Sequence, residues 1–510
     1  MTSDRVRRGA WGVAAVLVAL GLLCRCIALE RWPGLNGDEA WYGVQALDVL
    51  GGAFPALATP TGNAVNPFFL GLQVAVHGVL PASTVTVRLP ALVSGVAAVL
   101  LAWPLLRPLG RGSAAAGTVL LACLPLAIAY SRFGWDQSQG LLAGLLACGG
   151  ALRGRPLWTA LALVAAFVVH PSNLFVAPFL LALLWVRIPP GLPARARMRH
   201  AAALGLGAAA LVAGLAVLVP VGPRSEGLLS ELASLPHLLI WTLRMLSGTS
   251  IYTHVSAPPA AGTVLAHDAA GAVLAGILLG PGLGRAIRAR DADALAATAG
   301  LVASFLLFAM IAGRLARLPD AQRYGLFLVV PALIAALRLG RRLAPEAVLG
   351  GAVVAGALLL VSFASGYLEP LATQGGRAHR AFRTGAVEPK TALVTAIRAA
   401  TPDAPRVAAE DWWTFWPIHY LGSRPPPFQV SYLGAFRGDP SPEKVEAVQA
   451  TLATGAWVVG FEGGFAEALV ARAVPAAKIE RLDAWDPTGR RVLSAWRIAS
   501  PRASWDTGHR

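Results

Sequence analysis

The stretch SAAAGTVLLACLPLAIAY, residues 113–130, contains no charged side chain. As a helix it would be about 27 Å long, close to the roughly 30 Å hydrocarbon core of a bilayer. A second uncharged run of similar length covers residues 201–220. Runs of this kind predict helices that cross a membrane.

The composition of the whole chain agrees with these runs. Of its 510 residues, 56% are hydrophobic and only 14% are charged, and the mean hydropathy is +0.60. Soluble domains carry about 25% charged residues. We therefore predict a polytopic α-helical membrane protein rather than a soluble protein with buried helices.

The net charge of +16 does not indicate a nucleic-acid partner. Most arginines lie in short links between apolar runs, as topology signals do, and they form no basic stripe with interleaved aromatic residues. We expect membrane lipids, and no nucleic acid, as partners. The cysteines Cys24, Cys26, Cys123 and Cys148 all lie in apolar segments, and their spacing suggests neither a disulfide framework nor a metal site.

The apolar runs predict about eleven transmembrane helices. They cover residues 10–29, 86–106, 113–131, 137–152, 156–170, 172–186, 201–220, 262–280, 293–313, 324–340 and 346–365. The first run follows a basic start but lacks a clear cleavage site, so we interpret it as an uncleaved span. Arginines mark every second link between spans, which places those links in the cytoplasm.

This alternation requires residues 30–85 to form one large outer loop. The semi-apolar stretch at 66–80 would then lie along the membrane rather than cross it. Counting that stretch as a span would put the link containing Arg107 and Arg111 outside and break the alternation. We prefer the version in which the alternation is unbroken.

The outer loop opens with two adjacent acids, Asp38 and Glu39, in NGDEAWYG, residues 36–43. Asn36 or Asp38 can cap a helix here, and Asp38 and Tyr42 would share a face of it. Simple capping is one interpretation of the acids, and chemistry at the membrane surface is the other. Other polar residues predicted on the same side are Arg132, Asp136, His170, Tyr252, His254, Arg314, Arg317, Arg323 and Tyr324.

An ordered set of motifs resembles one family. The motifs are GDEAWYGVQALDVLGG (37–52), NPFFLGLQ (66–73), VRLPALVSG (87–95), YSRFGWDQSQGLL (130–142), HPSNLFVAP (170–178) and QRYGLFLVVPAL (322–333). They resemble membrane glycosyltransferases of the protein O-mannosyltransferase and aminoarabinose-transferase type, glycosyltransferase family 39 and its bacterial relatives, with the GT-C fold. Asn66-Pro67 stands where many relatives have two prolines. The resemblance implies transfer of a sugar from a polyprenyl phosphate on the outer face of the membrane.

The resemblance also implies site residues. Asp38 matches the favoured catalytic base, Glu39 its partner, and Asp136 a second outer-loop acid. Arg88 matches an arginine with a structural role. Arg323 and Tyr324 match an Arg-Tyr pair before a late span.

Elementary chemistry fits this assignment. A carboxylate can take the proton of the acceptor as it attacks the anomeric carbon, and direct displacement would invert that carbon. The departing lipid phosphate needs arginine at the membrane surface. The candidates are Arg323, the favoured one, with Arg132, Arg314 and Arg317, for each of which contact with lipid headgroups is the alternative. Tyr42, His170, Tyr252, His254 and Tyr324 are candidates to line the substrate pocket.

Some relatives bind a divalent metal. This sequence has no His, Cys or Asp cluster at ligand spacing, so we expect that no metal or other cofactor is required.

The chain changes character after residue 365. Residues 1–365 are predicted to form the transmembrane transferase domain, and residues 366–510 a small extracytoplasmic α/β domain. In the latter we expect strands at PRVAAED (405–411), GAWVVGFE (455–462) and RRVLSAWRIAS (490–500), and a helix at SPEKVEAVQATLAT (441–454). The aromatic segment EDWWTFWPIHYL (410–421) suggests a domain core or headgroup contact, with sugar stacking on Trp412, Trp413 or Trp416 as the sharper alternative.

These features predict a hexosyl or pentosyl transferase of the cell envelope. The Ala- and Arg-rich, Lys-poor composition suggests a bacterium, and therefore its cytoplasmic membrane. The rival is a transporter or flippase of a lipid-linked sugar. A transporter should place ionisable residues inside spans, whereas here the acids lie in outer loops. The sugar and the acceptor, whether glycan, lipid or protein, are not determined by the sequence.

Overall fold

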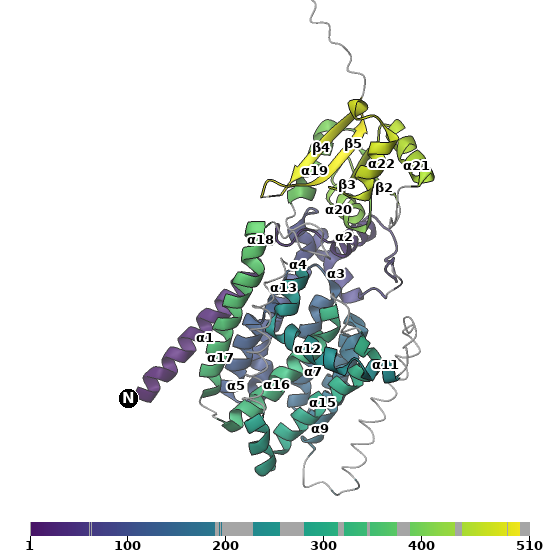
Figure 1. The fold of residues 1–510 in the computed structure, drawn as a ribbon. Coiled ribbons are helices and arrows are strands. Elements are labelled where there is room, and N and C mark those ends of the chain that lie inside the picture. Colours follow the sequence, from purple (N-terminus) through teal and green to yellow (C-terminus); the bar gives the residue numbers. More distant parts are fainter. Residues whose placement is uncertain are drawn as a thin grey trace, which may run out of the picture.

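We analysed a computed structural model of the chain. It describes residues 2–60, 62, 64–188, 193, 195, 228–255, 280–314, 321–343, 347–374, 388–433, 441–486 and 488–499. A helical bundle forms one end of the molecule, and a small domain with a sheet lies at the other end (Figure 1).

The helices of the first half are α1 (Thr2–Cys26), α2 (Gly37–Leu50), α3 (Pro67–His77), α4 (Thr84–Leu106), η1 (Arg107–Leu109), α5 (Arg111–Cys123), α6 (Pro125–Tyr130), η2 (Asp136–Gln139), α7 (Gly140–Leu152), α8 (Pro156–Val169), η3 (Pro171–Val176) and α9 (Ala177–Trp185). Those that follow are α11 (Leu228–Leu232), α12 (Leu235–Ser247), α13 (Thr249–Val255), α15 (Ala292–Ala312), η5 (Ala321–Gly325), α16 (Leu326–Leu343), α17 (Ala347–Phe363), η6 (Ala364–Leu368) and α18 (Glu369–Gln374).

Within the described part of the chain, five helices are long and apolar enough to cross a membrane. They are Gly9–Cys26, Thr84–Leu109, Ala292–Ala312, Arg323–Arg341 and Ala347–Thr373. The predicted spans at 10–29, 86–106, 293–313, 324–340 and 346–365 fall on these helices. The spans predicted at 201–220 and 262–280 lie outside the described residues, so the total of about eleven stays a prediction.

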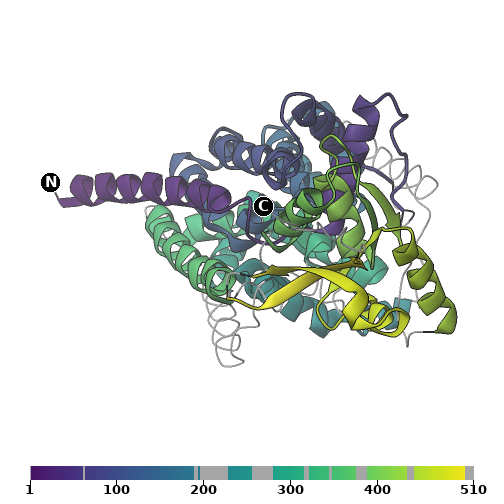
Figure 2. The ribbon, with the colours of Figure 1, turned by 90° about the horizontal axis from the view of Figure 1, so that it is seen from above.

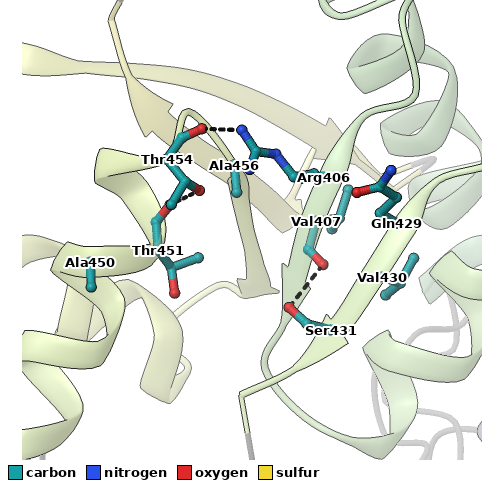
Figure 3. Close-up of a pocket in the computed structure, with 9 residues that line it drawn as sticks. All are labelled: Arg406, Val407, Gln429, Val430, Ser431, Ala450, Thr451, Thr454 and Ala456. Atoms are coloured by element: carbon teal, nitrogen blue, oxygen red, sulfur yellow. Dashed lines mark hydrogen bonds between the residues drawn. The ribbon is translucent and has the colours of Figure 1, made fainter.

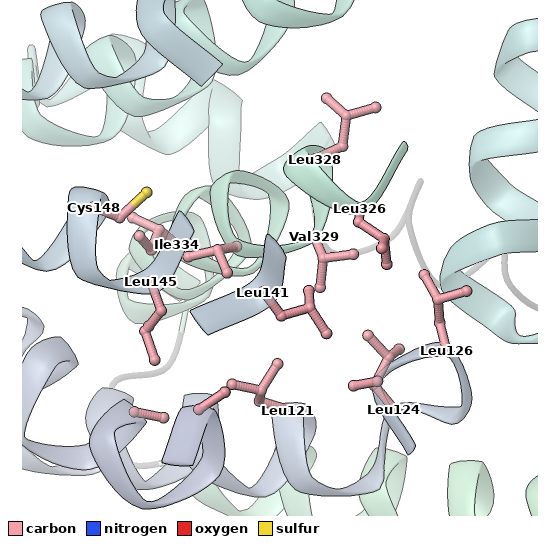
Figure 4. Packing of buried hydrophobic residues seen from close by; sticks show 14 of the residues in the cluster. Leu121, Leu124, Leu126, Leu141, Leu145, Cys148, Leu326, Leu328, Val329 and Ile334 are labelled. Carbon is pink, nitrogen blue, oxygen red and sulfur yellow. The ribbon is translucent and has the colours of Figure 1, made fainter. Parts of the chain in front are cut away.

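Side chains from α5, α6, α7 and α16 form the centre of the bundle. Leu121 of α5, Leu126 of α6, Leu141 and Leu145 of α7 and Ile334 of α16 all belong to this cluster (Figure 4). All five side chains are buried. The apolar surface of the spans is thus divided between contact with other helices and contact with the membrane.

The span predicted at 113–131 is broken into α5 and α6 at Leu124. Pro125 has no N–H to donate to the carbonyl of Leu121, so the helix cannot continue unchanged. Arg25, which is buried in the last turn of α1, donates to the carbonyls of Leu121 at 3.2 Å and Ala122 at 2.7 Å. The guanidinium supplies donors at the break, where water is excluded.

The C-terminal domain comprises α19 (Glu388–Ala400), β1 (Arg406–Ala409), α20 (Trp412–Leu421), β2 (Gln429–Tyr432), α21 (Pro442–Ala453), β3 (Trp457–Phe461), α22 (Phe465–Ala473), η7 (Ala476–Lys478), β4 (Ile479–Trp485) and β5 (Arg491–Ile498). The strand order is β2-β1-β3-β5-β4. β1 is parallel to β2 and β3, with Val407 opposite Val430 and Trp457, whereas β5 is antiparallel to β3 and β4.

Helices cover both faces of this sheet. Ile397 of α19 and Ile418 of α20 pack with one set of strand residues, and Val448 of α21 and Leu469 of α22 pack with the other. β3 is buried along its whole length, as its unbroken apolar sequence requires. Seen from above, the domain covers one end of the bundle, while α1 projects to the side (Figure 2).

Candidate functional site

The site is built around the start of α2. The Asn36 side chain accepts the N–H of Asp38 at 2.7 Å, and the Glu39 side chain accepts the N–H of Asn36 at 2.9 Å. This is a capping box, so the capping interpretation holds for Asn36 and Glu39. Asp38 lies in the first turn between them, and its carboxylate is not needed for the cap.

Glu39 is completely enclosed and has a donor on each side. Arg88 of α4 donates to its Oε1 at 2.8 Å and to its Oε2 at 2.9 Å, and both side chains are fully buried. The N–H of Gly134 donates to Oε1 at 2.6 Å. A carboxylate with four donors and no exposure has no free position for a substrate proton. Its geometry is that of a structural centre.

The bond from Gly134 joins two distant segments of sequence. It brings the loop of residues 132–136 against the start of α2. A Cβ at position 134 would lie 2.7 Å from the carbonyl of Val87, so only glycine allows this approach. Two residues later, Asp136 begins η2 and enters the same site as Asp38.

Asp136 lies between Tyr42, Asp38 and Arg323. Burial raises its pKa from 3.8 to about 6, and the nearby Asp38 carboxylate adds to the rise. A hydrogen bond from the Tyr42 side chain, the N–H of Gln137 at 3.0 Å and the charge of Arg323 act in the opposite direction. Burial and the same contact with Asp136 raise the pKa of Tyr42. Asp38 and Tyr42, predicted to share a helix face, thus both approach Asp136.

Residues of α3 and η2 support Asp38 and Asp136 from outside the site. Asn66 caps α3 through its side chain and also donates to Gln139 at 2.9 Å, which ties α3 to η2. Tyr42 packs edge-on against Phe69 of α3, with ring centroids 5.0 Å apart. The segment predicted to lie along the membrane is therefore also the support of Asp136.

Arg323 and Tyr324 lie in η5. The Arg323 guanidinium donates to the Tyr324 hydroxyl at 3.1 Å and lies 5.0 Å from the centre of that ring. His170 lies 5.6 Å from the same ring and contacts Ser172 through Nδ1 at 2.7 Å. The positive charge of Arg323 thus lies beside a surface made of Tyr324 and His170 and acts on Asp136.

The C-terminal domain reaches the site through Trp412 and Lys390. The indole N–H of Trp412 donates to Oδ1 of Asp38 at 3.0 Å. The amine of Lys390 is buried and donates to the carbonyl of Leu35. Burial lowers the pKa of Lys390 from 10.5 to about 7, although the carboxylates of Glu39 and Asp411 favour its charged form.

Other predicted site residues lie elsewhere. Arg132 is fully buried and donates to the carbonyls of Cys24 at 2.7 Å and Trp32 at 2.8 Å, so it cannot reach a lipid phosphate. Arg314 binds Glu231. The Tyr252 hydroxyl lies 3.0 Å from Ser362. Arg317 lies outside the described residues, and His254 is in α13 with its side chain also outside them.

Sequence reasoning missed Gly134 and Lys390 as parts of the site. A glycine directly before Trp135-Asp136 is a weak signal of close approach, and one of only three lysines in an arginine-rich chain is a weaker one. Trp412 was expected to face a sugar or a core rather than to bind Asp38.

Metal binding has little support among the residues that can be described. They contain no group of three or more His, Cys, Asp or Glu side chains able to hold an ion. Asp38 and Asp136 are the nearest approach to such a set. The expectation that no metal is required stays a prediction.

A separate open groove of about 500 Å³ lies in the C-terminal domain (Figure 3). Its wall includes Arg406 and Gln429, the first residues of β1 and β2, with Thr451 and Thr454 of the α21 end. Arg406 donates to the carbonyl of Thr454. The groove lies at the amino ends of the parallel strands, whereas Trp412 follows the carboxyl end of β1. It is therefore distinct from the site at Asp38.

No protein family and no curated protein sequence matches this chain. Solved structures do. The structure of ArnT from Cupriavidus metallidurans in the apo state has 15% identity and a TM-score of 0.54, and the match covers 96% of this chain and 98% of that one. The structure of the same ArnT bound to undecaprenyl phosphate has 15% identity and a TM-score of 0.54, and the match covers 95% of this chain and 98% of that one. The Archaeoglobus fulgidus oligosaccharyltransferase in the apo form gives 14% identity and a TM-score of 0.46, with coverage of 97% and 75%.

The match to ArnT extends over nearly the whole of both chains, and it therefore includes the bundle and the C-terminal domain together. At this identity it shows a shared fold. The resemblance to GT-C membrane glycosyltransferases inferred from the motifs is confirmed at the level of the fold.

Proposed function

We propose that this chain is a glycosyltransferase that moves a sugar from a polyprenyl-phosphate donor to an acceptor on the outer face of a bacterial cytoplasmic membrane. One observation carries the proposal. Asp38 and Arg323, from segments far apart in sequence, both act on the charge of the buried Asp136. The fold shared with ArnT, one structure of which is bound to undecaprenyl phosphate, supports the same class of donor.

The three side chains suit the transfer step. Asp38 has one oxygen on Trp412 and accepts the acceptor's proton as the acceptor atom bonds to the anomeric carbon. The bond from that carbon to the phosphate oxygen breaks, and the electron pair leaves with the polyprenyl phosphate. Arg323 stabilises the charge of the departing phosphate. A single displacement inverts the anomeric carbon.

Asp136 orients the acceptor in this proposal. Its pKa of about 6 leaves it mostly ionised at neutral pH, and its position beside Tyr42 gives it a fixed direction. Glu39 and Arg88 hold the scaffold that brings Asp38 and Asp136 together. The transferred sugar is a hexose or a pentose, and the reaction needs no metal.

The sidedness follows from charge. Arg5, Arg7 and Arg8 precede the first span, and further arginines mark every second link after it, which favours a cytoplasmic position for those links and an outer position for Asp38. Trp412 binds Asp38, so the C-terminal domain lies on the same side as the site. The whole transfer apparatus is then extracytoplasmic.

The test uses the purified full-length chain in liposomes that contain a synthetic polyprenyl-phosphate sugar and an extract of envelope acceptors. Release of free polyprenyl phosphate is measured together with labelling of the acceptor, with no ion gradient. We expect turnover by the wild type and a loss of about 10³-fold in Asp38→Asn. Asp48→Asn is the matched control, because Asp48 is an exposed acid at the other end of the same helix.

Two results would contradict the proposal. Movement of the intact lipid-linked sugar across the bilayer without release of polyprenyl phosphate would favour the transporter. Full turnover by Asp38→Asn would remove the proton-accepting role of Asp38.

A further inference from the structure

The C-terminal domain forms hydrogen bonds with the helical bundle. It contacts the start of α2 and the segment after α3 through four polar side chains. Trp412 binds Asp38, and Lys390 binds the carbonyl of Leu35. The Tyr420 hydroxyl donates to the carbonyl of Ser83 at 2.9 Å, and Arg424 donates to the carbonyl of Ala82 at 3.1 Å. Of these contacts, the one made by Trp412 reaches a carboxylate of the site.

Trp412 is held in place from several directions. Asp411 caps α20, and its carboxylate accepts the N–H groups of Trp413 and Thr414, so Trp412 occupies the first position of a fixed helix. A Cβ at Gly37 would lie 2.3 Å from the Trp412 ring. The ring of Trp416 meets that of Trp412 edge-on, with centroids 5.6 Å apart. The indole cannot turn away from Asp38 while α20 rests on α2.

The α20–α2 contact is itself close-packed. A Cβ at Gly43 would lie 2.5 Å from the Tyr420 ring. Tyr420 is buried with Leu35, Ala40 and Val44. Helix α20 is thus set at a fixed distance from the first turn of α2, and the position of the indole follows from that packing.

An indole is a particular partner for a carboxylate. It has one N–H donor and no acceptor, so it cannot take a proton from the acid or compete for the proton of a substrate. A hydrogen bond to an ionised oxygen favours the charged form and lowers its pKa. It also fixes the orientation of the carboxylate, and here it binds Oδ1 of Asp38.

We propose that Trp412 is a positioning residue of the transferase: its indole N–H, supplied by the C-terminal domain, holds the carboxylate of Asp38 in the orientation that receives the acceptor's proton. This inference rests on the proposed function. It makes the C-terminal domain a working part of the active centre rather than a separate module.

The kinetic test compares Trp412→Phe with wild type in the liposome assay. Phenylalanine keeps an aromatic face but has no N–H. We expect kcat to fall about 10- to 100-fold, the range for loss of a hydrogen bond to a charged group, with KM for the donor nearly unchanged.

Trp413→Phe is the matched control. It removes an indole one residue further along the same helix, where the ring packs with the core on the α19 side of the sheet. We expect Trp413→Phe to keep the wild-type kcat. A wild-type kcat in Trp412→Phe would overturn the inference, and so would a change confined to KM, which indicates sugar stacking instead.

A second measurement does not depend on turnover. In protein labelled with ¹⁵N-tryptophan, the indole signal of Trp412 is assigned by its loss in Trp412→Phe. We expect Asp38→Ala to shift that indole proton upfield, since the hydrogen bond is gone. An unmoved signal overturns the inference whatever the activity, whereas a shifted signal in a protein that transfers no sugar would contradict the proposed function and leave the contact standing.

Discussion

Asp38 and Glu39 are neighbours in sequence and opposites in environment. Glu39 is fully buried and accepts from Arg88, Asn36 and Gly134. Asp38 is only partly buried, and its Oδ1 accepts from Trp412. Asp136, the other acid of the site, has a pKa raised to about 6, whereas the carboxylate of Glu39 is neutralised by a guanidinium at 2.8 Å.

The difference shows how one pair of acids can serve two purposes. Side chains that are fully satisfied hold the backbone, and an acid that keeps capacity to accept a proton is available for chemistry. Here Glu39 joins two loops through Gly134, and those loops carry Asp38 and Asp136. The structural centre therefore determines the geometry of the reactive one.

The largest effect should come from breaking the structural centre. Arg88→Ala leaves the buried Glu39 carboxylate without its partner, and we expect a loss of about 3–5 kcal/mol in stability. Thermal unfolding of the purified protein in detergent measures it. The double variant Arg88→Ala, Glu39→Ala should lose less than the two single variants added together, and simple additivity would contradict the pairing.

Removing a reactive acid should leave the fold intact but lower activity. For Asp136→Asn we expect kcat to fall about 10²-fold or more, with an unfolding temperature at or above that of wild type, since a buried charge is removed. Transfer assays and thermal unfolding on the same sample separate the two effects. Wild-type turnover would show that Asp136 belongs to the scaffold instead.

A smaller loss of transfer activity is expected from substitution of Arg323. Arg323→Lys keeps the charge but loses the planar pair of donors, and we expect transfer to fall about tenfold, with Arg323→Ala falling further. The control is Arg314→Lys, because Arg314 binds Glu231 rather than facing the acids. Equal losses in both lysine variants would argue against a specific phosphate contact at Arg323.

The smallest effect should be a shift in pH dependence. In the wild type, activity should fall as pH drops through about 6, because Asp136 becomes protonated. The hydrogen bond from Tyr42 lowers the pKa of Asp136, so Tyr42→Phe should raise that pKa and move the fall in activity to higher pH. A pH–rate profile of each protein measures this, and a move to lower pH would contradict the assigned contact.

Much of this architecture was predictable because it depends on local chemistry. Apolar runs predicted the five long apolar helices of the described part of the chain, and the capping sequence at Asn36 marked the start of α2. The strands at β1, β3 and β5 and the helix α21 occur at the predicted places. β2 and β4 were missed, because an exposed or alternating segment at the edge of a sheet, such as the charged β4, gives only a weak apolar pattern.

Several members of the site were predictable, but their contacts were not. Asp38, Tyr42, Asp136, Arg323, Tyr324 and His170 were all placed on one side of the bilayer, and the structure brings them together. The pairing of Glu39 with Arg88 across 49 residues, and of Asp38 with Trp412 across 374, depends on how the helices pack. No local sequence pattern indicates that Glu39 pairs with the guanidinium and Asp38 with the indole.

The contacts of Arg25 depend on a segment that is synthesised later than Arg25 itself. The carbonyl of Ala122, which it binds, is translated 97 residues after it. Until α5 is inserted, α1 holds a cation near the end of an apolar segment that has no protein acceptor beyond its own turn, and the side chain must extend toward the headgroups. The first span therefore gains its last contacts only when the end of α5 is in place, and a chain that stopped before residue 121 would leave the Arg25 guanidinium without these acceptors.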